Sequence, residues 1–281
     1  MPRVVDPPTG AVPDERTANG CFETMRAYGG RIFRLHSHLD RLYASAQFLG
    51  TRAPSDRRRF SAQLTRALAR SALQEAVVRV ALMPRAGAEA SPSIVVQPAS
   101  IPPAALYRRG LRVAVVPARK FSVGSINPQS KYSARLGNVL AVTDAQLRQV
   151  DEALFLDETG SVTESTASNF GIVSRGAIVT PPIWLGLLAG ITRDVLLELA
   201  EALRMPVREE PLTRHDLYNA DEAFMTSTLK EVLAVTRIDG RTIGTGKPGP
   251  VTKRLLIEFR RLVRRELNIR SHHVTKTPRH P

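Results

Sequence analysis

Residues 118–130 interrupt an otherwise regular series of hydrophobic patterns along the chain. They contain Gly124 and Pro128 and show neither the alternation of a strand nor the spacing of a helix. With 281 residues, the chain can form one large domain or two modest ones. We therefore predict an interdomain linker at 118–130, between a first domain at 20–117 and a second at 131–267.

The first predicted domain combines strands and helices. Residues 20–27 alternate weakly between apolar and polar and predict a strand, which the turn residues at 28–31 make one arm of a hairpin. Apolar residues then recur at spacings of four and three from Leu35 to Leu49, which indicates an amphipathic helix. A second helix is expected between Phe60 and Leu73, with further strands at 76–83, 94–97 and 111–117. This domain is therefore expected to be a small α+β sandwich.

The second predicted domain begins with a helix over about 133–149. The expected strands that follow are 152–157, 162–164, 170–174, 177–180, 221–226 and 232–238, and the expected helices are 191–203 and 251–267. Residues 1–19 are rich in proline and predict a flexible arm, and the polar residues 268–281 predict a disordered tail. The fold class expected for the whole chain is α+β.

The net charge of +14 raises two possibilities, a polyanion partner or an arginine-rich composition dispersed over helix surfaces. The basic residues are spread along the chain, aromatic residues make up 5%, and no nucleic-acid motif is present. These features favour the dispersed composition and predict no nucleic-acid partner.

Cysteine content and hydropathy indicate the compartment. Cys21 is the single cysteine, which excludes a disulfide within the chain and a cysteine-based metal site. We expect a cytoplasmic protein without a bound metal. Residues 1–8 lack the apolar region of a signal peptide, and no apolar run approaches the roughly 18–20 residues that span a bilayer. No membrane association is expected.

Lys131 and Glu164 suggest a specific chemistry. Pyridoxal phosphate (PLP) enzymes need a lysine amine that forms a Schiff base with the cofactor and moves the substrate α-proton. They also need a group that holds the pyridine nitrogen protonated, and a site for the phosphate. Gly190 precedes the helix expected at 191–203, whose N-terminal N–H groups would favour an anion. Each feature alone has an ordinary alternative, such as a solvated lysine or a simple helix cap.

A series of short motifs extends over about residues 20–267. In chain order they are Phe22-Glu23-Thr24-Met25-Arg26, His38…Arg41-Leu42, Lys131, Asp151-Glu152-Ala153-Leu154, Val162-Thr163-Glu164, Ser168-Asn169-Phe170, Thr180-Pro181-Pro182, Gly190-Ile191-Thr192-Arg193 and Glu222-Ala223-Phe224…Ser227-Thr228. Taken in this order, the motifs resemble those of the class IV aminotransferases, the fold-type IV PLP enzymes that include branched-chain and D-amino acid aminotransferases and 4-amino-4-deoxychorismate lyase.

The resemblance implies a fold, an assembly and a set of roles. The family pairs a small α+β domain with a larger domain built on a barrel-like sheet, and its members are usually homodimers. Lys131 matches the Schiff-base lysine, and Glu164 matches the carboxylate that pairs with the pyridine nitrogen. The phosphate ligands would be Arg41, Ile191, Thr192 and Thr228. The backbone at Leu229 matches a turn that helps to hold the substrate carboxylate.

Arg26 and Arg79 lie on strands expected to border the pocket, where each could bind a carboxylate through two hydrogen bonds. Structural ion pairing is the alternative for both. The segment Pro84-Arg85-Ala86-Gly87-Ala88 lacks the histidine that D-amino acid aminotransferases carry there. A carboxylate trap specific for D-amino acids is therefore not expected. Transamination is the commoner activity among divergent members of the family, so the resemblance favours transamination between a small or branched-chain amino acid and a 2-oxo acid such as 2-oxoglutarate.

Two other functions remain open from the sequence. The segments Gly20-Cys21-Phe22 and Lys131…Arg135-Leu136 also resemble the deoxychorismate lyases, which release pyruvate and 4-aminobenzoate. A more distant possibility is a catalytically inactive basic binding protein on the same scaffold. The presence of both Lys131 and Glu164 argues against that possibility.

Overall fold

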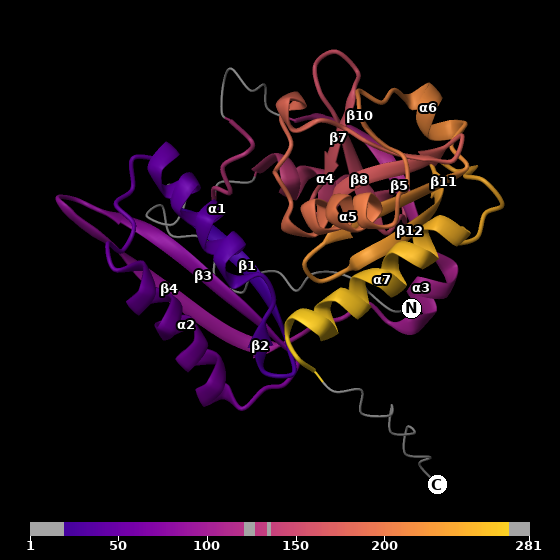
Figure 1. Cartoon of the computed structure of the whole chain (residues 1–281). Coiled ribbons are helices and arrows are strands. Elements are labelled where there is room, and N and C mark those ends of the chain that lie inside the picture. Colours follow the sequence, from indigo (N-terminus) through magenta and orange to yellow (C-terminus); the bar gives the residue numbers. More distant parts are fainter. Residues whose placement is uncertain (1–19, 121–126, 134–135, 270–281) are drawn as a thin grey trace, which may run out of the picture.

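The computed structural model of the chain describes residues 20–120, 127–133 and 136–269. The arm predicted at 1–19, the tail beyond residue 269 and part of the predicted linker lie outside these ranges. Figure 1 shows two sheets, each covered by helices, with helix α1 of the first lying toward the second. The expected α+β architecture, with a small domain and a larger barrel-containing domain, is confirmed.

The smaller part is an antiparallel four-stranded sheet in the order β2-β1-β3-β4. Alternate residues of β1 and β3, including Met25 and Val80, pack with the apolar side chains of the two helices in one core, as the two-residue period of a strand requires. The elements are β1 (Cys21–Tyr28), β2 (Arg31–Ile32), α1 (Leu35–Phe48), α2 (Arg57–Ser71), β3 (Ala76–Arg85) and β4 (Ala88–Pro98).

The larger part is a nine-stranded sheet in the order β10-β9-β8-β11-β12-β5-β6-β7, with β13 added to β12. Its strands are β5 (Leu111–Arg119), β6 (Glu152–Leu156), β7 (Val162–Ser165), β8 (Asn169–Ser174), β9 (Ala177–Thr180), β10 (Val207–Glu209), β11 (Glu222–Ser227), β12 (Glu231–Ile238) and β13 (Arg241–Thr242). Its helices are α3 (Ala104–Arg109), α4 (Leu136–Leu147), α5 (Ile191–Ala202), α6 (Arg214–Tyr218) and α7 (Pro250–Glu266), with a short 3₁₀ turn, η1 (Ile183–Leu185).

This sheet closes into a barrel because β7 pairs with both β6 and β8. The second of these pairings joins Glu164 to Asn169. Side chains such as Met225 and Leu233 belong to one core cluster, whereas their neighbours Phe224 and Val232 pack with α5 and α7 in another. The alternation shows that one face of these strands fills the barrel and the other face supports the helices.

One strand lies in a different sheet from the one that the sequence predicts. The strand expected at 111–117 in the first domain is β5, and it pairs in parallel with β12 and β6 of the larger sheet. Apolar alternation identifies a strand but not its partner, and both partners come later in the chain. The residue boundaries of the domains therefore stay a prediction. Among the described residues, no helix is both long and apolar enough to cross a bilayer.

Candidate active site

A cleft lies where α1 of the small part meets the barrel and the start of α5. It encloses about 440 Å³, including its open mouth. The residues predicted to hold the cofactor, which come from distant parts of the chain, all line it: Arg41, Lys131, Glu164, Ile191, Thr192 and Thr228. The structure therefore brings the predicted cofactor residues together in one place.

Lys131 is held by its backbone against the small sheet. Its carbonyl accepts a hydrogen bond from Phe22 N at 3.0 Å, and its own N–H donates to Ser45 Oγ of α1 at 3.0 Å. Tyr132 forms a bridge with Cys21 at the edge of β1. The Lys131 Nζ lies 4.9 Å from the centroid of the Phe22 ring. The small sheet thus fixes the base of this side chain while its amine reaches the cleft.

Glu164 lies on β7 and is buried, with both carboxylate oxygens occupied. Its Oε2 accepts from the Leu188 N–H at 3.0 Å and from Asn169 Nδ2 at 3.4 Å. Its Oε1 forms an ion pair with Lys120. Sequence reasoning missed Lys120, which falls in the stretch at 118–130 that was interpreted as a linker.

Arg41 reaches the cleft from α1 and is oriented by a buried carboxylate. Glu23, on β1, accepts from Arg41 Nε at 2.6 Å and from Arg41 Nη2 at 2.9 Å. It also lies 2.8 Å from His38 Nδ1. Arg41 Nη1 donates to the Ala189 carbonyl at 2.7 Å, beside the start of α5. Arg41 is therefore fixed from both sides.

Charge balance in this cluster favours an ionised glutamate. Burial alone would raise the pKa of Glu23, but Arg41 and His38 together hold it well below its usual range. Burial lowers the pKa of His38, and the positive charges of Arg41 and Lys131 oppose its protonation further, although Glu23 favours it. The sequence showed one overlooked signal. Glu23 shares a strand face with Cys21 and Met25, so it had to be buried and therefore paired.

The start of α5 presents backbone N–H groups to the cleft, and Gly190 is its N-cap residue. A Cβ at Gly190 would lie 1.8 Å from Asn169 Oδ1, so a larger residue would displace this wall. The hydroxyls of Ser168 and Thr226 also line the cleft and are buried without a hydrogen-bond partner among the described residues. Cationic side chains, free N–H groups and unpaired hydroxyls fit a polar, anionic group such as PLP.

The residues predicted to bind substrate lie elsewhere. Arg26 borders a smaller space that shares Ile191, Thr192 and Thr228 with the cleft, and its guanidinium pairs with Glu231 and Glu75. The Leu229 carbonyl accepts from Arg26 Nη1 at 3.4 Å. Arg79 lies opposite Thr24 in the sheet. No ion pair to Arg79 is found in the described part of the chain, and its Nε is buried without a partner.

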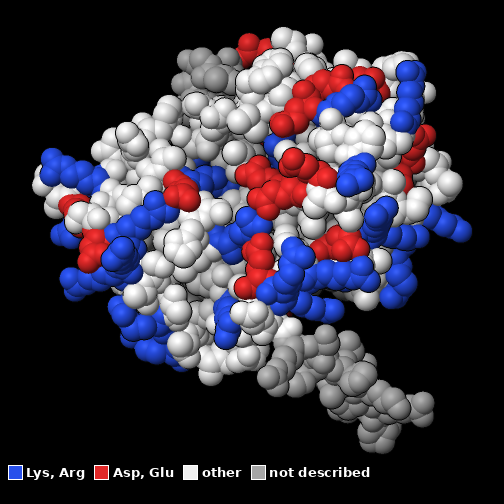
Figure 2. Space-filling view, viewed as in Figure 1, with Lys and Arg blue, Asp and Glu red and all other residues white. Residues whose placement is uncertain are grey.

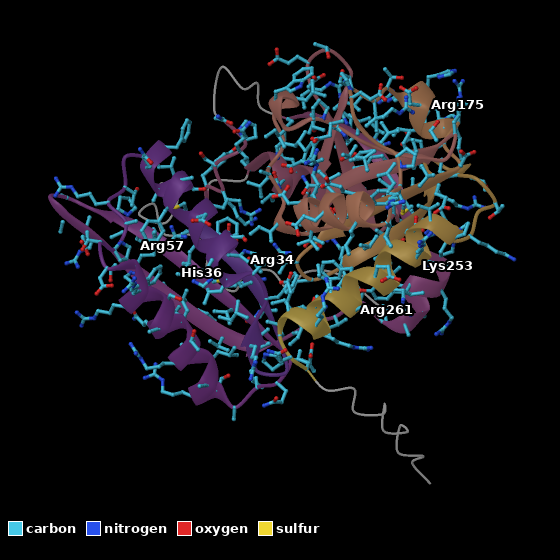
Figure 3. All side chains as sticks on the ribbon, viewed as in Figure 1. Arg34, His36, Arg57, Arg175, Lys253 and Arg261 are labelled. Atoms are coloured by element: carbon cyan, nitrogen blue, oxygen red, sulfur yellow. The ribbon has the colours of Figure 1, made fainter. Side chains whose placement is uncertain are left out.

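Charge elsewhere on the molecule is dispersed. Figure 2 shows lysine and arginine side chains over both parts of this face, with acidic side chains between them. Figure 3 labels several of them, among them Arg57 on α2 and Arg261 on α7, which extend from separate elements. The residues that the structure describes contain no group of three or more histidine, cysteine, aspartate or glutamate side chains that could hold a metal.

Comparison with known proteins agrees with this site. The profile of the amino-transferase class IV family matches residues 20–238, and the chain belongs to this family. A Methanocaldococcus jannaschii protein provisionally named a branched-chain-amino-acid aminotransferase is 38% identical over 249 residues, which cover 86% of each chain. A D-alanine aminotransferase of Bacillus licheniformis is 32% identical, with 84% of each chain covered.

A solved structure gives the same result. The T.th. branched-chain amino acid aminotransferase, complexed with N-(5'-phosphopyridoxyl)-L-glutamate, has a TM-score of 0.81 and 30% sequence identity. The match covers 87% of this chain and 84% of that one. This chain is therefore a PLP-dependent aminotransferase. The relatives do not favour the lyase alternative, and an inactive binding protein is likewise not supported.

Proposed function

We propose that this enzyme transfers the amino group of a branched-chain L-amino acid to 2-oxoglutarate. The relatives named above include branched-chain aminotransferases, and one of them holds a glutamate adduct of the cofactor. The observation that carries the proposal is Arg79, whose Nε is buried without a partner and which lies two residues from the buried apolar Val77 on the same face of β3. A cation next to an apolar surface suits one pocket that accepts the side-chain carboxylate of glutamate and the alkyl group of leucine in turn.

The roles proposed for the cleft residues follow from their positions. PLP, when bound, withdraws electrons from the α-carbon of an amino acid, which makes its proton acidic. Lys131 would carry this proton, because its amine is the basic group that reaches the cleft from the small sheet. Glu164 would hold the proton on the pyridine nitrogen. Arg41, Thr192 and Thr228 would bind the phosphate at the start of α5.

A donor panel tests the substrate class. We expect the PLP-loaded enzyme to form glutamate from 2-oxoglutarate with L-leucine, L-isoleucine or L-valine at least about tenfold faster than with D-alanine, because the segment at 84–88, where β3 turns into β4, lacks a histidine. Glutamate release and chiral analysis of the remaining donor provide the measurement. Faster turnover of D-alanine, or release of 4-aminobenzoate from aminodeoxychorismate, would contradict the proposal.

Arg79→Met tests whether Arg79 binds the second carboxylate of 2-oxoglutarate. It should raise KM for 2-oxoglutarate while leaving KM for a monocarboxylate 2-oxo acid, such as 4-methyl-2-oxopentanoate, nearly unchanged. Arg66→Met, which changes an exposed arginine on α2, is the matched control. An equal effect of Arg79→Met on both oxo acids would refute the assignment of this side chain to the second carboxylate.

The enzyme is also proposed to be a homodimer. Helix α4 exposes apolar side chains along one stripe, which monomeric proteins seldom do: Leu136, Val139, Leu140 and Leu147. Trp184, in the 3₁₀ turn η1, is exposed as well. Light scattering should give twice the mass of one chain, and Leu140→Glu should shift the protein toward monomer. A wild-type mass of one chain would exclude the dimer. The cytoplasmic location stays a prediction.

A further inference from the structure

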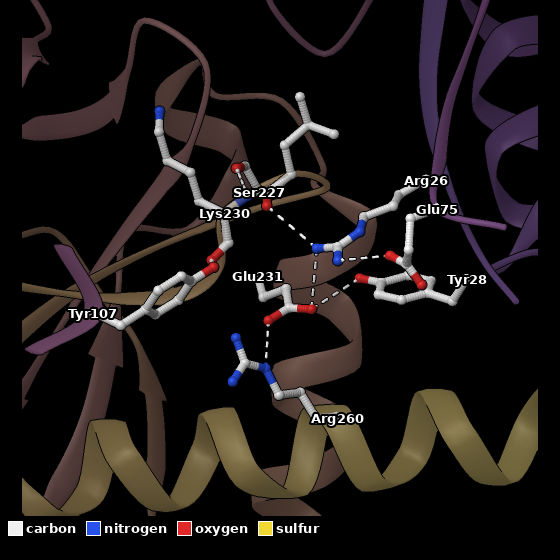
Figure 4. Close-up of polar contacts among 9 residues, drawn as sticks. Arg26, Tyr28, Glu75, Tyr107, Ser227, Lys230, Glu231 and Arg260 are labelled. Atoms are coloured by element: carbon white, nitrogen blue, oxygen red, sulfur yellow. Dashed lines mark hydrogen bonds and ion pairs between the residues drawn. The ribbon is translucent and has the colours of Figure 1, made fainter. Parts of the chain in front are cut away.

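A group of charged side chains, built on the buried pair Arg26 and Glu231, joins the two parts of the molecule behind the cleft (Figure 4). Its centre is Glu231, the first residue of β12, whose side chain is 3% exposed. Glu231 Oε1 accepts from Arg26 Nη1 at 3.1 Å and from the Tyr28 hydroxyl at 3.2 Å. Its Oε2 accepts from Arg260 Nε of α7 at 2.7 Å. One carboxylate thus binds groups from the small sheet and from the last helix.

Arg26 is engaged within this group through both of its Nη atoms. Its Nη1 also contacts the Leu229 carbonyl at 3.4 Å, and its Nη2 pairs with Glu75 at 3.1 Å. The guanidinium lies 4.1 Å from the centroid of the Tyr28 ring, and the side chain is 6% exposed. Both Nη atoms of this guanidinium are therefore committed to protein acceptors. Its buried Nε lacks a partner among the described residues, so a substrate carboxylate would have to compete with Glu231 and Glu75 for the rest of the group.

The same contacts hold the turn between β11 and β12, residues 227–230. Arg26 fixes its Leu229 carbonyl, and the Tyr107 hydroxyl donates to the Lys230 carbonyl at 3.0 Å. The Lys230 N–H donates to Ser227 Oγ at 3.2 Å. Within the described residues, the backbone N–H groups of Thr228 and Leu229 donate no hydrogen bond. The turn is therefore held through the carbonyls of Leu229 and Lys230. The N–H groups of Thr228 and Leu229 remain available to bind an anion.

The backbone of Glu231 supports this interpretation. Its φ is +57°, in the left-handed region that side chains other than glycine and asparagine seldom adopt. Such a conformation persists only where surrounding contacts impose it, and it is common at sites whose geometry matters for function. The ion pairs of Glu231 are the contacts that can impose it here.

We propose that Arg26 is a positioning residue. Together with Glu231 it holds the turn at 227–230 so that Thr228 and the adjacent N–H groups face the cleft. This inference rests on the proposed function, in which that turn contacts the cofactor phosphate and the substrate carboxylate. It replaces the expectation from the sequence that Arg26 binds substrate itself.

The test compares Arg26→Met with Arg34→Met. Arg34 also links the two parts through two carboxylates, Glu198 at 2.6 Å and Glu266 at 2.7 Å, but it does not touch the turn. Its label in Figure 3 lies between α1 and α7. Arg26→Met should weaken PLP binding about tenfold and lower kcat/KM about 100-fold, because a displaced anchor misplaces the bound groups. Arg34→Met should lower Tm and change PLP affinity less than about twofold.

A double-mutant cycle separates positioning from substrate binding. Glu231→Gln should reproduce the loss of PLP affinity, and the double variant should lose little more than the worse single variant, since both residues act through one turn. Arg26→Lys should retain more PLP affinity than Arg26→Met but less than wild type, because an ammonium lacks the planar, forked geometry of a guanidinium. If Arg26→Met raises KM for the oxo acid alone and Glu231→Gln behaves as wild type, Arg26 is a substrate ligand and the proposal fails.

Two further results are decisive. If Arg26→Met and Arg34→Met lower Tm alike and leave PLP affinity unchanged, the group is merely structural and the proposal is overturned. If Arg26→Met does not fold, Tyr28→Phe removes one hydrogen bond to Glu231 and should still weaken PLP binding, by about twofold to fivefold. An unaltered affinity in a folded Tyr28→Phe variant counts against the proposal. Failure of the wild type to take up PLP would instead overturn the proposed function, and this inference with it.

Discussion

Two buried glutamates, Glu23 and Glu231, each hold an arginine, but they leave it in different states. Arg41 gives Nε and Nη2 to Glu23 and Nη1 to a carbonyl at the start of α5, and its side chain is still part of the cleft wall. Arg26 is divided between Glu231, Glu75 and the Leu229 carbonyl, behind the cleft. The contrast shows that the partners of an arginine decide whether it can bind a ligand itself. The Glu23 group, which is Glu23 with Arg41 and His38, orients a side chain that lines the cleft. The Glu231 group, which is Glu231 with Arg26, holds a turn that reaches the cleft.

The largest expected effect comes from removing the amine that shares the cleft with Arg41. Lys131→Ala should reduce transamination by at least about 10²–10⁴-fold, because no other group in the proposed mechanism moves the α-proton. Turnover of L-leucine with 2-oxoglutarate measures it. Lys253→Ala, on the exposed side of α7, is the control and should keep full activity. Substantial turnover by the Lys131→Ala protein would show that the cleft beside the Glu23 group is not where the α-proton is moved.

Glu23→Gln should destabilise the protein by about 3 kcal/mol, because it leaves Arg41 buried beside an uncharged amide. Urea unfolding measures the change. Glu75→Gln is a suitable control, since Glu75 pairs with Arg26 from a side chain that is 47% exposed and should cost less than about 1 kcal/mol. Equal losses in the two variants would show that burial of the carboxylate does not distinguish these pairs.

Acid should weaken the Glu23 group. The folded-state pKa of Glu23 lies below its unfolded value of about 4.3, so its stabilising effect is complete above that pH and is lost as the pH falls. His38 acts in the same direction, because its pKa is lowered in the folded state and it binds protons more readily when unfolded. Stability should therefore fall between about pH 6.5 and pH 3. Below about pH 4.3, where Glu23 contributes, urea midpoints should decline less steeply for Glu23→Gln than for wild type.

The smallest expected effect concerns Glu164, the residue proposed to pair with the pyridine nitrogen of the cofactor. Lys120→Met removes the cation that now pairs with Glu164 Oε1 and would free that oxygen for the cofactor nitrogen. PLP affinity should rise by about twofold to fivefold, in line with an exchange between two partly buried ion pairs. An absorbance titration measures it, with Lys120→Arg as the charge-retaining control. A marked loss of affinity in Lys120→Met would show that Lys120 itself binds the cofactor.

Many helices and strands could be predicted because each depends on the spacing of apolar residues within a short stretch of the sequence. The spacing of apolar residues gave α1, α5 and α7 nearly to their ends, and alternation gave β1, β3 and β12. The sheet to which β5 belongs could not be predicted in this way, since pairing across more than a hundred residues leaves no local pattern. The short helices α3 and α6 were missed for a related reason, as one or two turns show too little periodicity.

The site divides along the same line. Residues within recognisable motifs, such as Lys131, Glu164 and Thr192, were identified, and the structure places them around one cleft. The residues that hold these motif residues in place were not identified from the sequence. Glu23 carried a usable signal in its strand alternation, whereas Lys120 and Glu231 acquire meaning only through partners distant in sequence. An arginine such as Arg26 could not be assigned without knowing which carboxylates surround it.

The position of β12 has a consequence for how the chain is made. It is inserted between β11 and β5, and it is the last of the strands that form the ring. Until the ribosome has released it, β5 and β11 each present an unpaired edge, which is the kind of surface that recruits other chains. Glu231 opens this strand, and its partner Arg260 emerges later still on α7. The turn that reaches the cleft therefore gains its support from Glu231 and Arg260 only after β5 and β11 have been made, so chains that stop before β12 would be aggregation-prone fragments rather than a weakened enzyme.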